Sequence, residues 1–363
     1  MKIVYISNSI IPSRFANSVH VMKMCNALSK YSYVELIAIK GEKEPNIHNK
    51  YGSEGKFNLH LIDKVTNIFG SFSYLFHIFI KVKKYQCSYL YGRHLLALLI
   101  LSIKNIPTIY EAHSMPSGNR KYLELILFKR KSFKKLVVIS EVLKNDYMKN
   151  YPLLKDDDII VAHDGADIPK KTSYEELNHD EKINIGYVGH LYVGRGIEII
   201  IQLAERLSDI NFHIIGGMEN DIIYWKAKTQ KFNNIFFYGY MSHDLLEKHY
   251  INYDILLAPY QTGINQSDGK SDTSRWMSPM KIFEYMSYQK VIVSSDIPVL
   301  REVLNENNSI LVESNNIDSW IDAIDKLKDK NTRDYLSKNA YYDFVNKYTW
   351  DKRAKYILDN IIE

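Results

Sequence analysis

Cysteine is scarce in this sequence, which contains only Cys25 and Cys87 among its 363 residues. Both lie in apolar segments, and neither has a second cysteine at a Cys-x-x-Cys spacing. We therefore expect neither a disulfide framework nor a zinc site, and we expect a reducing, cytoplasmic environment. We also expect no secretory signal, because the first residues have the pattern of a strand rather than of a basic segment followed by an apolar one.

Long apolar runs are missing too. The longest, residues 95–103, is about half of the ~20 residues that a membrane-spanning helix requires, so we expect a core helix there. No segment has low complexity, and a content of 46% hydrophobic and 25% charged residues is that of an ordinary soluble, folded protein. A chain of 363 residues exceeds what one hydrophobic core usually serves, which predicts two domains.

Charge of one sign does not dominate. The formal net charge is +5, and we expect no nucleic-acid partner. Positive residues do gather beside one apolar stretch, at Lys129, Arg130, Lys131, Lys134 and Lys135. Two interpretations of this segment remain open. It could hold the protein peripherally at the inner face of an anionic membrane, or it could be a solvated helix face, which is the more common meaning of such a run.

The chain contains two series of short apolar segments that alternate with helical segments, as buried parallel strands do. The first series is expected at 3–7, 34–39, 88–91, 108–111 and 136–139. The second is expected at 183–188, 212–215, 235–238, 255–259, 291–294 and 309–312. This alternation predicts two doubly wound, Rossmann-like α/β lobes, whose ligands lie at the carboxyl ends of the strands.

The domain boundaries follow from these two series. The pattern breaks around 164–171, and the polar run at 173–181 has the composition of an interdomain linker. We expect a first lobe over 1–170 and a second over 171–347. A C-terminal helix over 348–363 is expected to pack back on the first lobe.

A glycine-punctuated loop follows the first strand of the second lobe. It contains Gly189, Gly194 and Gly196, with Arg195 directly before the expected helix. Glycines let backbone amides approach a ligand, a helix N-terminus is partly positive, and arginine is a forked donor for phosphate oxygens. The loop therefore predicts a diphosphate site, although a tight strand-to-helix turn needs glycine for packing as well.

A second informative segment spans 278–287. Pro279 suits the first turn of a helix, where its missing N–H costs nothing. Lys281 and Glu284 are three residues apart and share one helix face. The carboxylate could accept both hydroxyls of a ribose while the amine meets a phosphate. The alternative is a plain surface ion pair.

Taken together, these two segments resemble the retaining glycosyltransferases of family 4, which have the GT-B fold. Segments elsewhere in the chain also match the family, in the order in which the family has them, at 15–21, 111–114, 163–167 and 238–243. The likeness spans nearly the whole chain. It implies two Rossmann-like lobes that face each other across a cleft, with the acceptor bound by the first lobe and the donor by the second.

The resemblance also implies an activity. The enzyme would move a sugar, with retention, from a UDP-sugar or GDP-mannose to a glycan or lipid-linked acceptor in the synthesis of lipopolysaccharide, capsule or another surface glycolipid. No metal and no other cofactor would be needed. The catalytic residues implied are His113, Arg195 and Glu284. The donor-binding residues implied are Asn17, Gly189, His190, Arg195, Gly239, Tyr240, Met280, Lys281 and Glu284.

The sequence departs from the family pattern at three places. Trp276 stands where members commonly have the first of two glutamates, and Asp268 or Asp272 could substitute for it. His190 stands in place of an arginine, which leaves Arg195 as the main phosphate cation of its loop. Ala16–Asn17 replaces a pair of glycines, and asparagine is able to adopt the left-handed conformation that glycine allows.

Three other functions compete with transfer. Nucleotide-sugar epimerases share the two-lobed fold, but no motif here provides their paired carboxylates. A non-catalytic nucleotide-sugar binder is conceivable because of Trp276. A dehydrogenase is disfavoured, since no Gly-x-Gly-x-x-Gly follows the first strand.

Overall fold

The computed structural model describes residues 1–63, 70–169, 182–192, 194–241, 243–261 and 275–362. The chain forms two compact units. The first unit comprises Met1–His163 and Trp350–Glu363, and the second comprises Asp164–Thr349. The unit boundary thus lies seven residues before the predicted end of the first lobe at 170, and the predicted linker at 173–181 lies outside the described residues.

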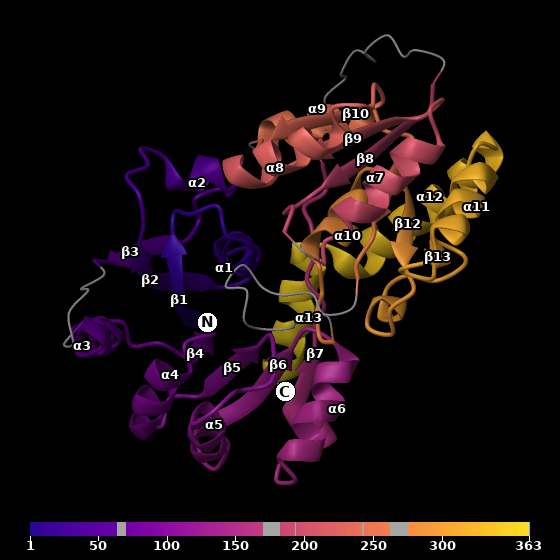
Figure 1. Ribbon diagram of the computed structural model, residues 1–363. Coiled ribbons are helices and arrows are strands. Elements are labelled where there is room, and N and C mark those ends of the chain that lie inside the picture. Colours follow the sequence, from indigo (N-terminus) through magenta and orange to yellow (C-terminus); the bar gives the residue numbers. More distant parts are fainter. Residues whose placement is uncertain (64–69, 170–181, 193, 242, 262–274, 363) are drawn as a thin grey trace. The chain divides into compact units, whose positions relative to one another are not determined.

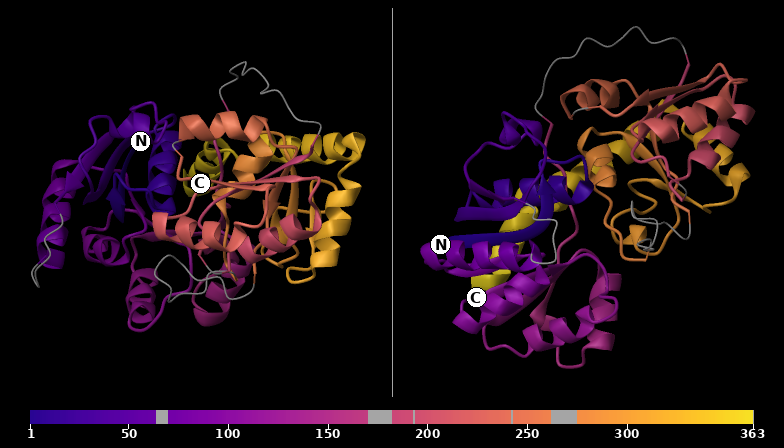
Figure 2. Two further views of the ribbon diagram at one scale, coloured as in Figure 1. Left: turned by 45° about the horizontal axis from the view of Figure 1, so that its top comes forward. Right: turned by 60° about the vertical axis from the view of Figure 1, so that its left-hand side comes forward.

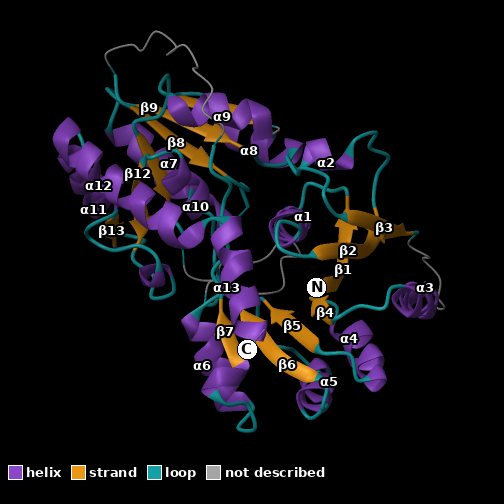
Figure 3. Cartoon of the chain, turned by 180° about the vertical axis from the view of Figure 1, so that it is seen from behind, coloured by secondary structure: helices purple, strands orange, loops and turns teal. Residues whose placement is uncertain are grey.

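The first unit is a parallel sheet in the order β3-β2-β1-β4-β5-β6-β7 (Figures 1 and 3). Its strands are β1 (Lys2–Ile11), β2 (Tyr33–Lys40), β3 (Asn58–Ile62), β4 (Tyr89–Gly92), β5 (Thr108–Ala112), β6 (Phe133–Val138) and β7 (Ile159–Val161). Its helices are α1 (Ala16–Leu28), α2 (Ile47–Lys50), α3 (Gly70–Lys84), α4 (Leu95–Leu101), α5 (Arg120–Phe128), α6 (Glu141–Asn150) and α13 (Trp350–Ile362), with 3-10 turns η1 (Ser102–Lys104) and η2 (Asp156–Asp158). The strand order reverses direction between β1 and β4, as in doubly wound sheets.

The last helix belongs to the first unit. Helix α13 packs against α1 and approaches β6 (Figure 2). Tyr89, at the start of β4, donates a hydrogen bond from its hydroxyl to the carbonyl of Ile361 at 3.2 Å. Trp350, Ala354, Ile357 and Leu358 are buried on the inner face of the helix. Helix α13 therefore belongs to the first unit although it follows the second unit in the sequence.

The second unit repeats the architecture, in the order β10-β9-β8-β11-β12-β13. Its strands are β8 (Asn184–Val188), β9 (Asn211–Ile215), β10 (Ile235–Gly239), β11 (Ile255–Ala258), β12 (Val291–Ser295) and β13 (Ile310–Val312). Its helices are α7 (Ile197–Arg206), α8 (Glu219–Thr229), α9 (His243–Ile251), α10 (Met280–Ser287), α11 (Ile317–Lys326) and α12 (Lys330–Asp343), with a 3-10 turn η3 (Leu300–Glu302) and a π-helical segment η4 (Phe344–Tyr348). The order reverses between β8 and β11, which places a ligand-binding switch point at the end of β8.

Both units confirm the predicted fold class of two Rossmann-like α/β domains. Central strands are buried on both faces, as β5 and β11 show along their whole length. Burial explains the unbroken apolar sequence of β11, whereas β5 also contains the buried polar residues Thr108 and Glu111. In the second unit Phe212, Ile214 and Trp320 lie in one buried cluster with residues of α7 and α11. Among the described residues no helix has both the length and the apolar character needed to cross a membrane.

Candidate active site

The strand ends of the second unit are held together by glycines. The amide of Gly189 donates to the carbonyl of Ile215 at 2.9 Å, and the amide of Gly216 donates to that of Gly239 at 2.8 Å. Gly216 has a φ of +114°, and a Cβ there would lie 2.0 Å from the carbonyl oxygen of Gly189. The carboxyl ends of β8, β9 and β10 therefore form one continuous edge, with no room for a side chain at Gly216.

The N-terminus of α7 opens at this edge. Gly196 precedes the helix with a φ of +80°, and a Cβ on it would lie 1.9 Å from the carbonyl oxygen of Pro259, just after β11. No side chain of the described residues caps the helix, so its first amides are available to a ligand. An uncapped helix N-terminus at a switch point suits an anion such as phosphate.

Arg195 lies beside this helix start. Its guanidinium donates to the Tyr192 hydroxyl at 2.6 Å. Its central carbon lies 4.9 Å from the centre of the Tyr192 ring and 5.7 Å from that of Tyr260. The buried Nε has no hydrogen-bond partner among the described residues. A buried N–H without a partner is costly, and a phosphate oxygen is the kind of acceptor that would satisfy it.

Lys281 approaches the same tyrosines from the first turn of α10. Its Nζ lies 4.1 Å from the centre of the Tyr187 ring and 4.6 Å from that of Tyr260. It has no ion pair with any carboxylate of the described residues, Glu284 included, so the simple surface pair is not formed. Burial lowers the pKa of Lys281 well below its ordinary value, and the nearby charge of Arg195 lowers it further. The nearby charge of Glu284 acts in the opposite direction. Arg195 and Lys281 thus lie at the same Tyr260 ring without an ion pair to a described carboxylate, and a bound anion would favour the protonated form of Lys281.

Glu284 lies one turn further along α10. One oxygen accepts a hydrogen bond from the Tyr250 hydroxyl at 3.0 Å, and the ring of Tyr250 stacks on that of Tyr288 at 4.6 Å. The carboxylate is thereby fixed at one oxygen, while the other makes no hydrogen bond within the described residues. That arrangement is suited to accept sugar hydroxyls.

The other predicted donor residues of this unit surround the same edge. His190 is half-buried and packs on Tyr192 at 5.4 Å. Burial lowers the pKa of His190, and so do the charges of Arg195 and Lys281, so it is neutral and does not replace the charge of an arginine. Gly239 ends β10, the exposed Tyr240 follows it, and the half-buried Met280 begins α10.

Trp276 is half-buried in a turn before α10. Asp268 and Asp272, the suggested substitutes for the missing family glutamate, lie outside the described residues.

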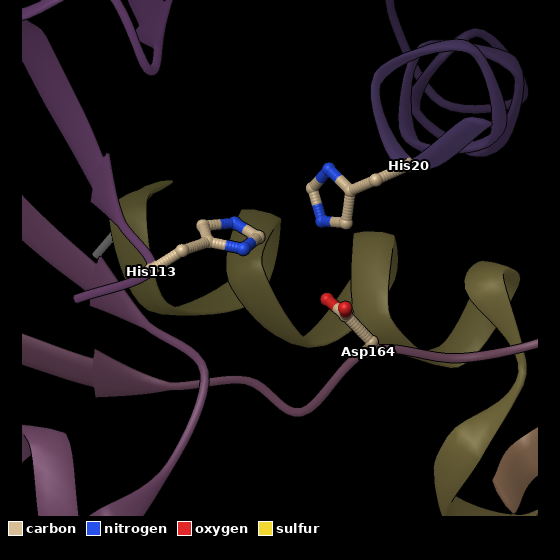
Figure 4. Close-up of side chains that lie close together, drawn as sticks. All are labelled: His20, His113 and Asp164. Atoms are coloured by element: carbon tan, nitrogen blue, oxygen red, sulfur yellow. The ribbon is translucent and has the colours of Figure 1, made fainter. Parts of the chain in front are cut away.

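The first unit contains a second polar cluster, built on Glu111 near the end of β5. The side chain is fully buried. One carboxylate oxygen lies 2.8 Å from Nε2 of His113 and 3.1 Å from Nε2 of His20. Figure 4 shows His20 projecting from α1 and His113 from the end of β5 toward each other, and their rings meet edge to face at 4.7 Å.

Three further side chains donate to the same carboxylate, although they are far apart in sequence. Arg353 of α13 donates to it at 3.0 Å, and the hydroxyls of Tyr5 and Tyr91 donate at 3.2 Å and 2.6 Å. Burial on its own would raise the pKa of Glu111, but the charge of Arg353 and the two histidines hold it well below its ordinary value. Glu111 is therefore an ionised, buried carboxylate.

The ionised carboxylate determines the state of His113. Burial lowers the pKa of His113 to about 4, and the charge of Arg93 contributes, so the ring is neutral at pH 7. Because Glu111 is an acceptor only, Nε2 of His113 carries the proton, and Nδ1 is left as an acceptor. A neutral imidazole in this orientation can accept a hydrogen bond from a sugar hydroxyl.

Asn17 differs from the expectation for the first lobe. It is exposed in the first turn of α1, whose residues are helical, and positive φ values occur among described non-glycine residues only at Asn105 and Gln289. The left-handed conformation considered for Asn17 is not adopted, because α1 begins one residue earlier. Figure 4 also labels Asp164, the first residue of the second unit, whose amide donates to the Ser278 hydroxyl at 2.8 Å.

The basic segment predicted from the sequence follows α5. Lys129, Arg130, Lys131 and Lys134 are exposed. Lys135 is half-buried and donates to the carbonyl of Asp157 at 2.6 Å.

Sequence reasoning missed two functional candidates, His20 and Arg353. Arg353 lies 242 residues from its partner Glu111, and no local motif marks it. Arg353 shares one face of α13 with Trp350 and Ile357, and this helical spacing is the sequence signal that its side chain points inward.

Comparisons with known proteins cover both units. Residues 169–343 match the family model described as glycosyl transferases group 1. An uncharacterized glycosyltransferase of Methanocaldococcus jannaschii is 28% identical over 189 residues, which is 49% of this chain and 44% of that protein. The aligned part thus spans less than half of that relative.

Solved structures match over the whole chain. A glycosyltransferase from Rickettsia africae has a TM-score of 0.76 at 16% identity, covering 99% of this chain and 97% of that one. Anabaena HepE, crystallised with UDP and glucose, has a TM-score of 0.74 at 13% identity, with 100% of both chains covered. The lipopolysaccharide outer core galactosyltransferase WaaB has a TM-score of 0.67 at 16% identity, covering 100% and 99%. At these identities the likeness establishes the GT-B fold, and with the family match it supports a glycosyltransferase.

Proposed function

We propose that this protein is a retaining glycosyltransferase that moves a sugar from a nucleotide diphosphate sugar to a glycan or lipid-linked acceptor in surface polysaccharide or glycolipid synthesis. One observation carries the proposal. Arg195 and Lys281 lie around the Tyr260 ring without an ion pair to a carboxylate of the described residues, beside the N-terminus of α7, which no described side chain caps. This arrangement lies within the segment that matches the glycosyl transferases group 1 model.

The second unit supplies the donor site in this proposal. Arg195, Lys281 and the amides at the start of α7 bind the diphosphate, the free oxygen of Glu284 accepts the ribose hydroxyls, and the backbone at Gly239 and Tyr240 meets the base. A uridine nucleotide is the first candidate, because the structurally similar HepE was crystallised with UDP and with UDP-glucose. GDP-mannose is the alternative donor.

The chemistry follows from where charge develops. As the bond from the anomeric carbon to the diphosphate oxygen breaks, negative charge grows on the leaving diphosphate, and fixed cations stabilise that transition state more than the ground state. The acceptor hydroxyl attacks the anomeric carbon from the face that the diphosphate leaves, and its proton passes to a departing phosphate oxygen. The configuration is then retained. We propose that Arg195 and Lys281 make a metal ion unnecessary.

In this proposal His113 of the first unit has a role in orienting a sugar hydroxyl. Glu111 fixes the proton on Nε2, which directs the acceptor Nδ1 to a sugar hydroxyl. With its pKa near 4, the ring is a poor general base at neutral pH, and its role is to orient the sugar. Glu111 is a positioning residue that acts through His113.

A non-catalytic nucleotide-sugar binder is the second candidate, since Trp276 stands where a donor-contacting carboxylate is common in similar enzymes. It predicts binding of the donor without product. The test is to incubate the protein with UDP-sugars and GDP-mannose in the presence of EDTA, with glycan and glycolipid acceptors, and to follow release of the nucleotide. Release of UDP or GDP, with a new glycosidic bond whose anomeric configuration by NMR is that of the donor sugar, supports retaining transfer. Nucleotide binding with no release under any acceptor supports the binder.

A further inference from the structure

One stretch of the chain has no acidic residue. The sequence contains 42 Asp and Glu residues among 363, yet residues 64–110, the 47 positions between Asp63 and Glu111, contain none. The same stretch contains Lys64, Lys81, Lys83, Lys84, Arg93 and Lys104. Helix α3, helix α4 and the turn η1 are built from it. Where its lysines are exposed, as Lys83 and Lys84 are in α3, such an acid-free stretch favours a negatively charged partner.

Helix α3 is apolar on two faces. Tyr74, Ile78 and Val82, four residues apart, are buried against the first unit. On another face Phe76 is 63% exposed, Phe79 39% and Ile80 50%. These three positions, spaced i, i+3 and i+4, lie side by side on the helix surface, and the exposed Lys83 continues the row. Packing within the unit explains the first face but leaves the second uncovered.

Neighbouring elements extend this outer face. Nζ of Lys104, in η1, lies 3.9 Å from the centre of the Phe79 ring, and the adjacent Ile103 is 66% exposed. Figures 1 and 3 show α3 beside α4 at the flank of the first unit. The Ser132 hydroxyl donates to the carbonyl of Ser102 at 3.1 Å, so the basic segment at 129–131 adjoins η1. The result is an apolar strip with lysines along it.

We propose that this surface, formed by Phe76, Phe79, Ile80, Ile103 and the lysines at 83, 84 and 104, binds the anionic face of a lipid bilayer. Exposed aromatic and aliphatic side chains on one helix face enter the boundary between headgroups and acyl chains, and lysines beside them attract anionic headgroups. The segment at 129–131, which the sequence alone singled out, contributes charge at the edge of this surface. The proposal rests on the proposed function only for its purpose, which is to bring the enzyme to a lipid-linked acceptor.

The test is co-sedimentation of the full-length protein with vesicles of phosphatidylcholine, with and without phosphatidylglycerol. We expect binding to the anionic vesicles that weakens at high salt. The triple variant Phe76→Ala, Phe79→Ala, Ile80→Ala should bind at least tenfold more weakly. The matched control replaces three other exposed apolar residues, Ile223→Ala, Tyr224→Ala and Tyr335→Ala, and should bind as the wild type does.

A charge variant separates the two components. Lys83→Gln, Lys84→Gln, Lys104→Gln should lose the preference for anionic vesicles, and it should lose more than Lys129→Gln, Arg130→Gln, Lys131→Gln does. The proposal is overturned if the wild type ignores anionic vesicles or if the α3 variant binds them unchanged. It is also overturned if gel filtration shows a dimer that the α3 substitutions dissociate, because a second copy of the chain then covers this face. Thermal stabilisation by UDP, measured on the same variants, reports the donor site separately, so failure of one proposal is distinguishable from failure of the other.

Discussion

Replacing Arg195 tests the donor site where its structure is most specific. In the folded protein its guanidinium contacts the Tyr192 hydroxyl and two tyrosine rings, and its buried Nε has no partner in the described part of the chain. Its charge also lowers the pKa of Lys281. The residue is therefore placed for a ligand rather than for stability, and Arg195→Ala should weaken binding of UDP while leaving the unliganded protein folded.

The expected magnitude follows from the contacts that would be lost. A hydrogen bond to a charged group contributes about 1.5–3 kcal/mol, which corresponds to a loss of roughly 10- to 150-fold in affinity at 1.4 kcal/mol per factor of ten. The effect on folding should be smaller. Removing Arg195 costs one hydrogen bond to Tyr192 but relieves the repulsion of Lys281, so the unfolding temperature without ligand should change little.

Isothermal titration with UDP, paired with thermal unfolding, measures both quantities. Arg206→Ala is the matched control, because Arg206 lies in the last turn of the same helix α7 and pairs with the exposed Asp318. The control should bind UDP as the wild type does. Unchanged UDP affinity in Arg195→Ala, or a loss equal to that of Arg206→Ala, would refute this account of the site.

Further predictions concern the neighbouring groups. Burial and Arg195 hold the pKa of Lys281 well below its ordinary value, and a bound diphosphate should raise that pKa. UDP binding should therefore take up a proton and weaken as the pH rises. Calorimetry in buffers of different ionisation enthalpy measures the proton uptake, which Lys281→Met should abolish. His113 binds a proton near pH 6.5 in the unfolded chain but only near pH 4 in the folded protein. The free energy of urea unfolding should therefore fall by up to about 3 kcal/mol as the pH drops through this window. His113→Ala should make that fall smaller, and it should lower turnover more than UDP binding. Glu284→Gln keeps the Tyr250 hydrogen bond and should still weaken UDP binding about tenfold, whereas equal affinity in a UDP titration would remove Glu284 from the ribose site. Gly196→Ala should lower the unfolding temperature and UDP affinity together, because φ is +80° and the new Cβ meets the carbonyl of Pro259.

The fold could be predicted because its signals are local. Strands such as β11 are buried on both faces and are uninterrupted apolar segments, and the alternation with helices gives the doubly wound order. No strand or helix is predicted from the sequence between β2 and β4. Strand β3 is half-exposed at the sheet edge, and α3 is apolar on two faces, which blurs the helical period on which the prediction depends.

The donor site could be predicted from the sequence for the same reason. Gly189, Arg195 and Gly196 lie within one loop, and Lys281 and Glu284 within one turn, so their spacing carries the chemistry. The cluster around Glu111 could be predicted only in part. His113 lies two residues away, but Arg353 reaches the carboxylate from the other end of the chain, and neither its pairing nor that of His20 leaves a pattern in a single sequence.

The most direct test of the central claim, a nucleotide diphosphate site that works without metal, is a thermal-shift series with UDP, GDP, ADP and CMP, each with and without EDTA. A ligand that binds only the folded state raises the unfolding temperature. We predict that UDP or GDP stabilises the protein equally with and without EDTA, and that Arg195→Ala loses this stabilisation. Stabilisation by none of the four, or stabilisation that EDTA abolishes, would contradict the account.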